Sequence, residues 1–538
     1  MDDKKFAIII HKTNDDACNR LIDSLQNVDV PEGYDAEILP VEGDEKFFVY
    51  DFAMNQSDAK YKLYLDENII VQEKNILANL LEIFQSDEKI GIIGVSGAVE
   101  LSAHGLCWGS IKRCGKFFFD NDKSLVEESN FDVAAQDVDA VDGFFMATQY
   151  DLNWRYDLFH ENTFGDTAQC IEFRRQGGGY RTVVAYQKTA WIWYAANTFQ
   201  FDEESRQIFL DEYSKDIFPL VSVLIPTFNR PEWFRQALKS VLNQTYRNLE
   251  VIISDNSTND ETEQLIQRYL IVDSRIKYFH HKNFSADDNW NFARSYNNPS
   301  AEYVNWLMDD DLFYPQKIEF MIEIYRNNPD VSLVTSKRDF IDENGKINSQ
   351  SKNPFEGTKK VSGEEAGKLL FLIDNYIGEP TTVLIRKKFL RNNDLCLFED
   401  ETGFYPLVDV STWLQLLTQG NLFWMDESLS MMRNHDNQQT FFKGTGLAMI
   451  MCWAKFLKKI LDRKIFLKTE TEIRSAFIHW LHILSLKLRE AQQMNYTGAE
   501  ISILEEFYIA MAKAFRNGYK IELPPIKYSG VDKFQEIY

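Results

Sequence analysis

The sequence predicts an α/β protein with two similar sheet domains in tandem, followed by a helical region. Short apolar runs, which are typical of buried strands, alternate with helical spacing through most of the chain. One motif at a strand end occurs in both halves, and the last part of the chain shows helical patterns. A chain of 538 residues also exceeds one ordinary domain, because domains average roughly 150 residues.

The first domain is expected at 1–204, where strand and helix patterns alternate from the start. Such alternation implies a mostly parallel sheet with crossover helices, as in Rossmann-like folds. Strands are predicted at 6–10, 36–40, 61–65, 90–95 and 142–147, and helices at 16–25, 76–84 and 165–176. The polar and charged residues of 205–217 predict a linker.

The pattern restarts in a second domain, expected at 218–440. Strands are predicted at 220–225, 249–254, 276–280, 303–307, 332–336 and 381–385, and helices at 233–242, 261–270 and 289–294. From 441 to 538 the chain reads as helices, whose apolar stripes mix with lysine and arginine. That mixture fits either a packed bundle or helices that bind a membrane surface or a partner.

Charge and cysteine content exclude several function classes. The formal charge of -24 disfavours binding to nucleic acid and fits a protein that needs a cation before it holds an anionic ligand. The six cysteines form no Cys-x-x-Cys pair, which argues against zinc sites and disulfides and favours a reducing cytosol. The start of the chain lacks the apolar segment that is typical of a signal peptide. The chain also contains no uncharged apolar run of about 18 residues, the length that would predict a membrane-spanning helix. We therefore expect a cytoplasmic protein, with peripheral membrane contact left open.

Three consecutive acids follow the apolar run 303–307, namely Asp309, Asp310 and Asp311. Open α/β sheets place ligand sites at the carboxyl ends of such strands. Clustered carboxylates there suit a hard divalent cation that bridges to phosphates. The alternative is a solvated acidic turn that caps the next helix.

The same pattern occurs earlier in the chain. Residues 58–68 resemble residues 300–310, and aligning the two stretches places Asn68 against Asp310. Further on, Asp166 and Asp409 each lie 11 residues before a glycine, and the stretch between is helix-like in both cases. Two matches in the same order predict two copies of one α/β domain.

The second half strongly resembles glycosyltransferase family 2. The resemblance rests on the stretches 221–230, 240–246, 249–260, 289–291 and 308–311, and on 433–435 followed by 438–440. It implies a GT-A fold and a nucleotide-sugar-dependent, hexosyltransferase-like enzyme. The residues that it assigns to the nucleotide sugar are Pro226, Thr227, Asn229, Asp255, Asn283, Asn291 and Asp309. For Asp255, an Asx-turn with the residues that follow is a competing interpretation.

The family resemblance also implies a metal site and a general base. Asp310, Asp311 and His435 would hold Mn²⁺ or Mg²⁺, which neutralises the departing nucleoside diphosphate as a Lewis acid. Asp409, at a helix start, matches the acid that takes the acceptor's hydroxyl proton. Its competing interpretation is a plain helix N-cap. One base without a second acid suits inversion of configuration.

The first half resembles a related branch of the same family through 90–97, 141–147 and 173–179. It departs from that branch at the metal aspartate, which is replaced by Asn68, a weaker and neutral ligand. Tyr194 stands near the place where the branch has a histidine.

Several acids of the first half keep the branch's positions. Asp66 and Asp142 would bind the donor sugar nucleotide, with Asp142 at an acceptor-side position, and Asp166 would be the base. Asp66 and Glu67 remain possible metal ligands.

The leading hypothesis is an inverting bacterial glycosyltransferase. It would use a UDP- or dTDP-sugar and extend a surface polysaccharide or a protein-linked glycan. The alternative is a single active domain, with the N-terminal half as a non-catalytic acceptor-binding or scaffolding module. A wholly non-catalytic scaffold would make Asp309, Asp310, Asp409 and His435 coincidental.

Overall fold

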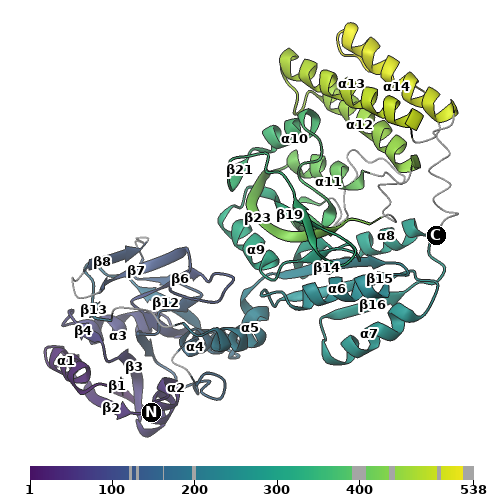
Figure 1. Ribbon diagram of the computed structural model, residues 1–538. Helices are drawn as coiled ribbons and strands as arrows, with labels where there is room; N and C mark the ends of the chain where they lie inside the picture. Colours follow the sequence, from purple (N-terminus) through teal and green to yellow (C-terminus); the bar gives the residue numbers. More distant parts are fainter. Residues whose placement is uncertain are drawn as a thin grey trace. The chain divides into compact units, whose positions relative to one another are not determined.

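The structure is a computed structural model that describes residues 1–119, 124–128, 133–160, 163–196, 201–390, 407–435, 443–493 and 498–524. The chain forms two compact units, Met1–Phe218 and Pro219–Tyr538 (Figure 1). We call them the N-terminal unit and the C-terminal unit.

The N-terminal unit alternates strands and helices as expected. Its elements are β1 (Asp2–Lys12), α1 (Asp15–Leu25), β2 (Asp35–Glu42), α2 (Lys46–Gln56), β3 (Ala59–Asp66), β4 (Ile69–Val71), α3 (Ile76–Ser86), β5 (Ile90–Gly94), β6 (Ser96–Glu100), β7 (Lys112–Phe119), β8 (Ser124–Glu128), β9 (Ala135–Asp137), β10 (Ala140–Val141), β11 (Phe145–Thr148), α4 (Gly165–Arg175), β12 (Arg181–Ala185), β13 (Ile192–Tyr194) and α5 (Glu203–Ile217). The sequence patterns did not predict α2, nor the strands β4, β6, β7, β8, β9, β10, β12 and β13.

Two sheets build this unit. The main sheet has the order β2-β1-β3-β11-β5-β12-β9, and the second sheet has the order β10-β6-β7-β13-β4, with β8 beside β7. In the main sheet β11 runs antiparallel to both its neighbours, whereas β1, β2 and β3 are parallel. The middle of β1 is fully buried, which explains its continuous apolar run.

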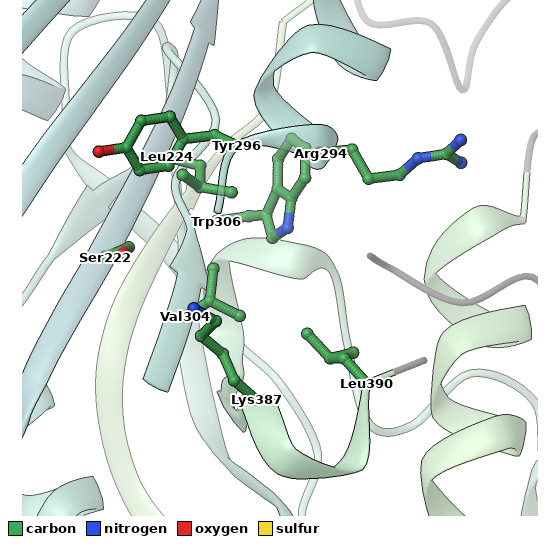
Figure 2. A pocket seen from close by; sticks show the side chains of 8 residues that line it. All are labelled: Ser222, Leu224, Arg294, Tyr296, Val304, Trp306, Lys387 and Leu390. Carbon is green, nitrogen blue, oxygen red and sulfur yellow. The ribbon is translucent and has the colours of Figure 1, made fainter. Parts of the chain in front are cut away.

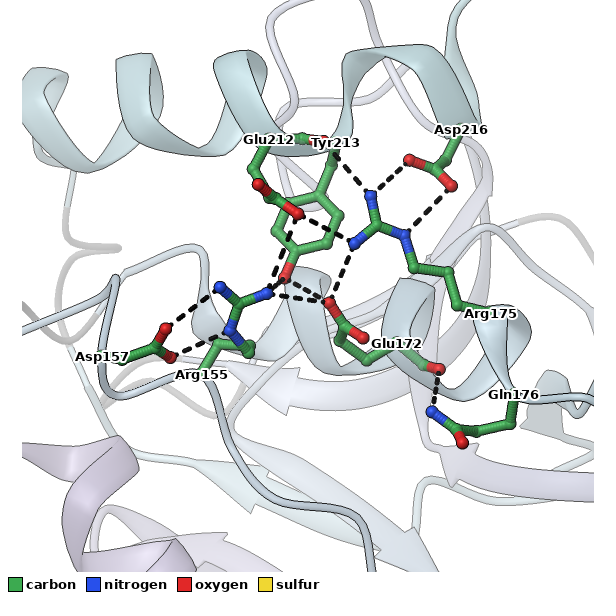
Figure 3. Close-up of polar contacts among 8 residues, drawn as sticks. All are labelled: Arg155, Asp157, Glu172, Arg175, Gln176, Glu212, Tyr213 and Asp216. Carbon is green, nitrogen blue, oxygen red and sulfur yellow. Dashed lines mark hydrogen bonds and ion pairs between the residues drawn. The ribbon is translucent and has the colours of Figure 1, made fainter.

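The stretch expected as a linker, 205–217, is helical and belongs to α5. Phe209 and Tyr213 on this helix are fully buried. Figure 3 shows how charged side chains fasten it to α4: Arg175 donates to Asp216 at 2.7 Å and to Glu212 at 3.0 Å. Helix α5 is therefore part of the N-terminal unit's packing.

The C-terminal unit repeats the arrangement and adds helices. Its elements are β14 (Leu220–Thr227), α6 (Pro231–Leu242), β15 (Leu249–Asp255), α7 (Glu261–Val272), β16 (Ile276–His280), α8 (Ala286–Ser295), β17 (Ala301–Trp306), β18 (Leu312–Phe313), α9 (Lys317–Asn327), β19 (Val331–Ile341), β20 (Ile347–Gln350), β21 (Lys359–Val361), α10 (Gly363–Leu372), η1 (Pro380–Thr382), β22 (Leu384–Arg386), η2 (Lys387–Phe389), α11 (Val408–Leu417), β23 (Asn421–Arg433), α12 (Lys443–Arg463), α13 (Glu470–Gln493) and α14 (Gly498–Arg516).

The two main sheets share one topology. The main sheet of the C-terminal unit has the order β16-β15-β14-β17-β22-β19-β23-β18. Its stretch β15-β14-β17-β22-β19-β23 corresponds to β2-β1-β3-β11-β5-β12 in the N-terminal unit. Ile9 faces Tyr64 in one unit, and Leu224 faces Trp306 in the other. When Ile9 is matched to Leu224, Tyr64 and Trp306 occupy equivalent positions. The predicted tandem of α/β domains is confirmed.

The C-terminal helices form a packed bundle. Trp453, Phe477 and Phe507, from α12, α13 and α14, belong to one buried core, which also includes residues of the adjoining sheet domain. The ring of Phe371 on α10 lies 5.5 Å from that of Trp453. Figure 1 shows the three long helices side by side. In the described parts of the chain, no helix has the length and apolar character needed to cross a membrane.

Candidate functional site

The carboxylate of Asp309 lies where β14 and β17 end, and these strands are parallel neighbours. Its Oδ2 atom accepts hydrogen bonds from the Thr227 hydroxyl at 3.0 Å and from the Phe228 amide at 3.3 Å. Burial and the negative charge of Asp310 raise the pKa of Asp309. The acidic loop and the end of the first strand thus form one polar cluster at the sheet edge.

Asp310 lies beside a histidine from the far end of the domain. Its Oδ2 atom is 2.9 Å from Nε2 of His435, which lies 125 residues further along, after β23. The Arg230 guanidinium donates to the same oxygen at 3.1 Å and to Asp309 at 3.3 Å. The ring of Trp233 lies 4.5 Å from that of His435. Sequence reasoning gave no role to Arg230 or Trp233.

The third acid of the loop points into the protein. Asp311 is 1% exposed, and its Oδ2 atom accepts a hydrogen bond from the Thr381 hydroxyl at 2.7 Å. Its Oδ1 atom accepts one from the Arg433 amide at 3.0 Å, and the Arg433 side chain donates to the carbonyl oxygen of Asp310 at 2.8 Å. Both oxygens of Asp311 already have partners, so this geometry favours a structural role over metal binding.

Asp255 ends β15, opposite Thr227 in the sheet register. Its Oδ1 atom accepts the amide of Ser257 at 2.7 Å, which forms the Asx-turn that competes with a ligand role. Its Oδ2 atom accepts the Tyr278 hydroxyl at 2.7 Å. Both oxygens of Asp255 thus have protein partners, as those of Asp311 do, and a ligand N–H would have to share one of these oxygens.

The amide residues that sequence reasoning assigned to the donor divide into two groups. Asn229 has a φ of 49° and bonds to Thr258, next to the ends of β14 and β15. Asn283 and Asn291 are exposed. The buried amide of α8 is Asn289, whose Nδ2 donates to the backbone oxygen of residue 254 at 3.0 Å and to that of residue 227 at 3.4 Å.

Pro226 is buried within β14. It directly precedes Thr227, so it shapes the strand end without offering an N–H to a ligand.

Asp409 lies in the first turn of α11, whose cap position is Leu407. Its Oδ2 atom accepts a hydrogen bond from Nδ2 of Asn375 at 3.0 Å. Burial raises the pKa of Asp409 to about 7, and the negative charge of Glu379 adds to that rise. A carboxylate with such a pKa suits proton transfer near neutral pH.

A joining segment, residues 374–382, connects the acidic loop to Asp409. Thr381 of this segment binds Asp311, and Asn375 binds Asp409. Asn375 also bonds to the backbone of Gly378, which has a φ of 107° that favours glycine.

The N-terminal unit builds the corresponding strand ends with other residues. Glu67 stands at the place of Asp309 in the shared register. Its Oε2 atom accepts the amides of Thr13 and Asn14, each at 2.8 Å, and its Oε1 atom accepts the Thr13 hydroxyl at 2.5 Å. Glu67 therefore holds the loop after β1, as Asp309 holds the loop after β14.

Asn68 takes the place of Asp310, as the sequence alignment predicts. Its amide N–H and its side-chain Nδ2 both donate to Oδ1 of Asp66, at 2.9 Å and 2.8 Å. One oxygen of Asp66 is thereby engaged within its own turn.

The acceptor side is more alike in the two units. Arg113 donates to Oδ2 of Asp142 at 2.5 Å, and the Ser96 hydroxyl donates to the same oxygen. In the C-terminal unit, Nε of Arg338 lies 2.7 Å from Oε2 of Glu379. Each carboxylate comes just before the antiparallel strand, β11 or β22. Neither arginine was singled out from the sequence.

Asp166 is packed against the segment that carries Asp142. A Cβ atom added to Gly143 would lie 1.8 Å from Oδ2 of Asp166, so only glycine fits there. Burial raises the pKa of Asp166, although the Thr167 amide donates to its Oδ1 atom at 2.8 Å. Tyr194 stacks on Phe144, with ring centroids 4.6 Å apart, at the side where a histidine was expected.

A pocket lies apart from these carboxylates, against the sheet between α8 and η2 (Figure 2). Trp306 and Lys387 are among the side chains that line it, and none of the lining residues is acidic. The pocket therefore offers no carboxylate to a metal ion or to a proton transfer.

Comparison with known families agrees with this geometry. Residues 7–213 match the family described as "Glycosyltransferase like family", and residues 222–393 match "Glycosyl transferase family 2". Together the two matches span more than half of the chain. The chain belongs to glycosyltransferase family 2. It is an enzyme with two glycosyltransferase domains in tandem.

Individual relatives of this glycosyltransferase share about three tenths of their residues with it. An uncharacterized glycosyltransferase of Rickettsia typhi is 29% identical over 255 residues, which are 46% of this chain and 75% of that protein. The GalNAc(5)-diNAcBac-PP-undecaprenol beta-1,3-glucosyltransferase of Campylobacter jejuni is 30% identical over 205 residues, or 38% of this chain and 62% of that protein. Among solved structures, S. aureus TarS 1–349 in complex with UDP-GlcNAc has a TM-score of 0.37 and 15% identity, and covers 56% of this chain and 92% of that one.

Proposed function

We propose that the C-terminal unit transfers a sugar from a nucleotide-sugar donor to a glycan hydroxyl, with inversion of configuration. The observation that carries this proposal is the 2.9 Å approach of His435 to Asp310 at the end of β17. Two residues far apart in sequence meet at the sheet edge where α/β proteins bind ligands.

The residues at this edge fit a divalent cation. Asp310 and His435 offer one carboxylate and one imidazole, and no third His, Cys, Asp or Glu in the described ranges joins them as a ligand group. Mg²⁺ is often held by one or two carboxylates together with substrate phosphates, so two protein ligands suffice. Bound there, Mn²⁺ or Mg²⁺ would act as a Lewis acid on the leaving diphosphate. Asp311 would position Asp310 rather than bind the ion.

The strand ends beside Asp310 suit the nucleoside of the donor. Asp255 would accept an N–H of the base, and Asp309 would face the ribose, between Thr227 and Arg230. Asn289 ties these strand ends together and would keep the nucleoside site rigid. A UDP- or dTDP-sugar is the donor that we expect.

Asp409 would be the general base. It lies in the same unit, and the joining segment links it to the acidic loop. Its pKa near 7 lets it accept the acceptor's hydroxyl proton at neutral pH. Asn375 donates to one carboxylate oxygen and would leave the other for the acceptor. A single base supports a single displacement, which inverts the anomeric centre.

The acceptor that we propose is a glycan of a bacterial surface polysaccharide or glycoprotein. The relative from Campylobacter jejuni is named for an undecaprenol-diphosphate-linked glycan. An acceptor of that kind would bring the enzyme to the cytoplasmic face of a membrane.

The N-terminal unit supports a second candidate arrangement. It has Asn68 in place of Asp310, and its Glu67 is already bonded to the loop after β1. These observations favour one active transferase domain, with the N-terminal unit as a non-catalytic acceptor-binding or scaffolding module.

Nucleotide release from UDP-, dTDP- and GDP-sugars with Mn²⁺ tests the proposal. We expect one donor to be turned over by the wild type and not by Asp310→Asn. Equal turnover by the two proteins would refute the assignment of Asp310. Turnover of a different donor by Asp310→Asn would show a second active domain.

A further inference from the structure

The first turn of α2 places a buried lysine inside the N-terminal unit's acidic site. Lys46 is 7% exposed, and its Nζ atom donates to the carbonyl oxygen of Gly143 at 3.0 Å. Gly143 follows Asp142 in the chain and is in contact with Asp166. The ammonium group therefore lies at the acceptor-side carboxylates.

The positive charge of Lys46 also affects the pKa values of Asp166 and of His11. Burial raises the pKa of Asp166, and the charge of Lys46 is the largest effect that opposes this rise. Burial and the charge of Lys46 both lower the pKa of His11. The charges of Asp66 and Glu67 act on that pKa in the opposite direction. The geometry agrees, because the carbonyl oxygen of Phe144, the residue after Gly143, accepts the Asp66 amide at the end of β3 at 2.9 Å.

A second residue of α2 points to the same place. Tyr50, one turn after Lys46, is fully buried, and its hydroxyl has no hydrogen-bond partner in the described part of the chain. Burial raises the pKa of this hydroxyl, and the charges of Asp66 and Asp166 add to the rise. The Lys46 ammonium lies 5.7 Å from the centre of the Tyr50 ring, a cation–π distance.

The ligands that a divalent cation would need are absent or engaged here. Asn68 is neutral, and Glu67 accepts three hydrogen bonds from the loop after β1. Asp66 is held by Asn68, and the ring at the expected histidine position is Tyr194. The residues of the N-terminal unit thus do not fit the metal that its family implies.

We propose that the Lys46 ammonium supplies, at this site of the N-terminal unit, the positive charge that a divalent cation would supply, so that the unit holds no divalent cation. A buried charge has to be hydrogen-bonded or paired, and the Lys46 ammonium is hydrogen-bonded to the carbonyl oxygen of Gly143. The inference rests on the proposed function only in placing the chain's metal at Asp310 and His435.

Counting Mn²⁺ ions on the full chain by electron paramagnetic resonance tests the inference. We expect one ion per wild-type chain, a loss of binding in Asp310→Asn, and unchanged binding in Asp66→Asn. A second ion that survives Asp310→Asn and disappears with Asp66→Asn would overturn the inference. If the wild type binds no ion at all, the metal in the proposed function is wrong, whereas the N-terminal inference is supported.

A second measurement tests the role of Lys46 directly. In the Asp310→Asn background, Lys46→Met removes the cation that acts on Asp166, while Arg113 still pairs with Asp142, so millimolar Mn²⁺ should raise its melting temperature. The matched control is Lys62→Met, because Lys62 is also fully buried and pairs with Asp151 at 2.7 Å, away from the site. Lys46→Arg keeps the charge and should not respond to Mn²⁺. Equal responses of Lys46→Met and Lys62→Met would overturn the inference.

Discussion

The Arg230 guanidinium donates at 3.1 Å to the Asp310 oxygen that lies 2.9 Å from His435. It also contacts Asp309, so one cation from the loop after β14 bridges two acids of the loop after β17. Arg230 and a divalent ion bound by Asp310 would contact the same oxygen, so they would compete for it.

Replacement of Arg230 by glutamine should therefore change metal affinity. Without the guanidinium, the negative charges of Asp309 and Asp310 are less compensated, so Mn²⁺ should bind more tightly in the absence of nucleotide. We expect a gain of about threefold to tenfold by calorimetry, an order-of-magnitude figure for one partly exposed charge. Arg235→Gln is the control, because Arg235 pairs with Glu232 on the surface of α6. Weaker Mn²⁺ binding in Arg230→Gln would contradict the competition.

His435→Gln should weaken Mn²⁺-dependent donor binding. Loss of one of two protein ligands should cost at least the roughly 10- to 100-fold that is typical even for outer-shell partners of a metal. Calorimetry with UDP and Mn²⁺ measures the effect. His482→Gln, at an exposed position on α13, should behave as the wild type. Unchanged affinity in His435→Gln would remove the histidine from the metal site.

Asp409→Asn should keep donor binding and lose transfer. A base acts on the acceptor, so its loss should lower kcat by about 10²- to 10⁴-fold, the range for general base catalysis, while the donor Kd stays the same. Steady-state transfer and donor calorimetry together check this. Normal turnover in Asp409→Asn would place the base elsewhere.

The pH dependence of stability should report the same residue. The pKa of Asp409 is about 7 in the folded chain, against an ordinary value of 3.8. Between these two values the folded state binds more protons than the unfolded state, so this group's contribution to stability falls as pH rises. Asp409→Asn should thus exceed the wild type in Tm at pH 8, with a smaller difference at pH 5. The opposite order at pH 8 would show that Asp409 is not held in a desolvated site.

Removal of Arg113 should destabilise the N-terminal unit strongly. Its guanidinium is the buried partner of Asp142, and both side chains are less than one tenth exposed. Arg113→Met would leave an unpaired buried carboxylate, at a cost of about 3–5 kcal/mol. Urea unfolding measures the loss, and Arg113→Met/Asp142→Leu should recover much of it. Full stability of the single variant would contradict the buried pair.

The sequence predicted the strand ends well, because apolar periodicity and the family motifs fix where each strand stops. Asp309, Asp310 and His435 come together as expected. Side-chain direction was harder to predict. Asp311 adjoins Asp310 in sequence, yet the turn after β17 aims it inward.

Helix periodicity explains why the sequence pointed to Asn291, whereas the amide that binds the strand ends is that of Asn289. Asn289 and Asn291 are two residues apart on α8 and so lie on different faces, and the buried one is Asn289. Helix α2 was missed for a related reason: apolar residues occur all around it, so it lacks the one-sided stripe that identifies a helix. Lys46 could not be placed before its helix was known.

The paired arginine and carboxylate beside β11 and β22 occur in both units, whereas the histidine and the second aspartate of the acidic loop occur in only one. The contacts that hold this edge of the sheet thus recur in both units, independently of the residues that we propose for the ion. A unit of this fold can therefore lack the proposed metal ligands and still keep the buried ion pair beside its antiparallel strand.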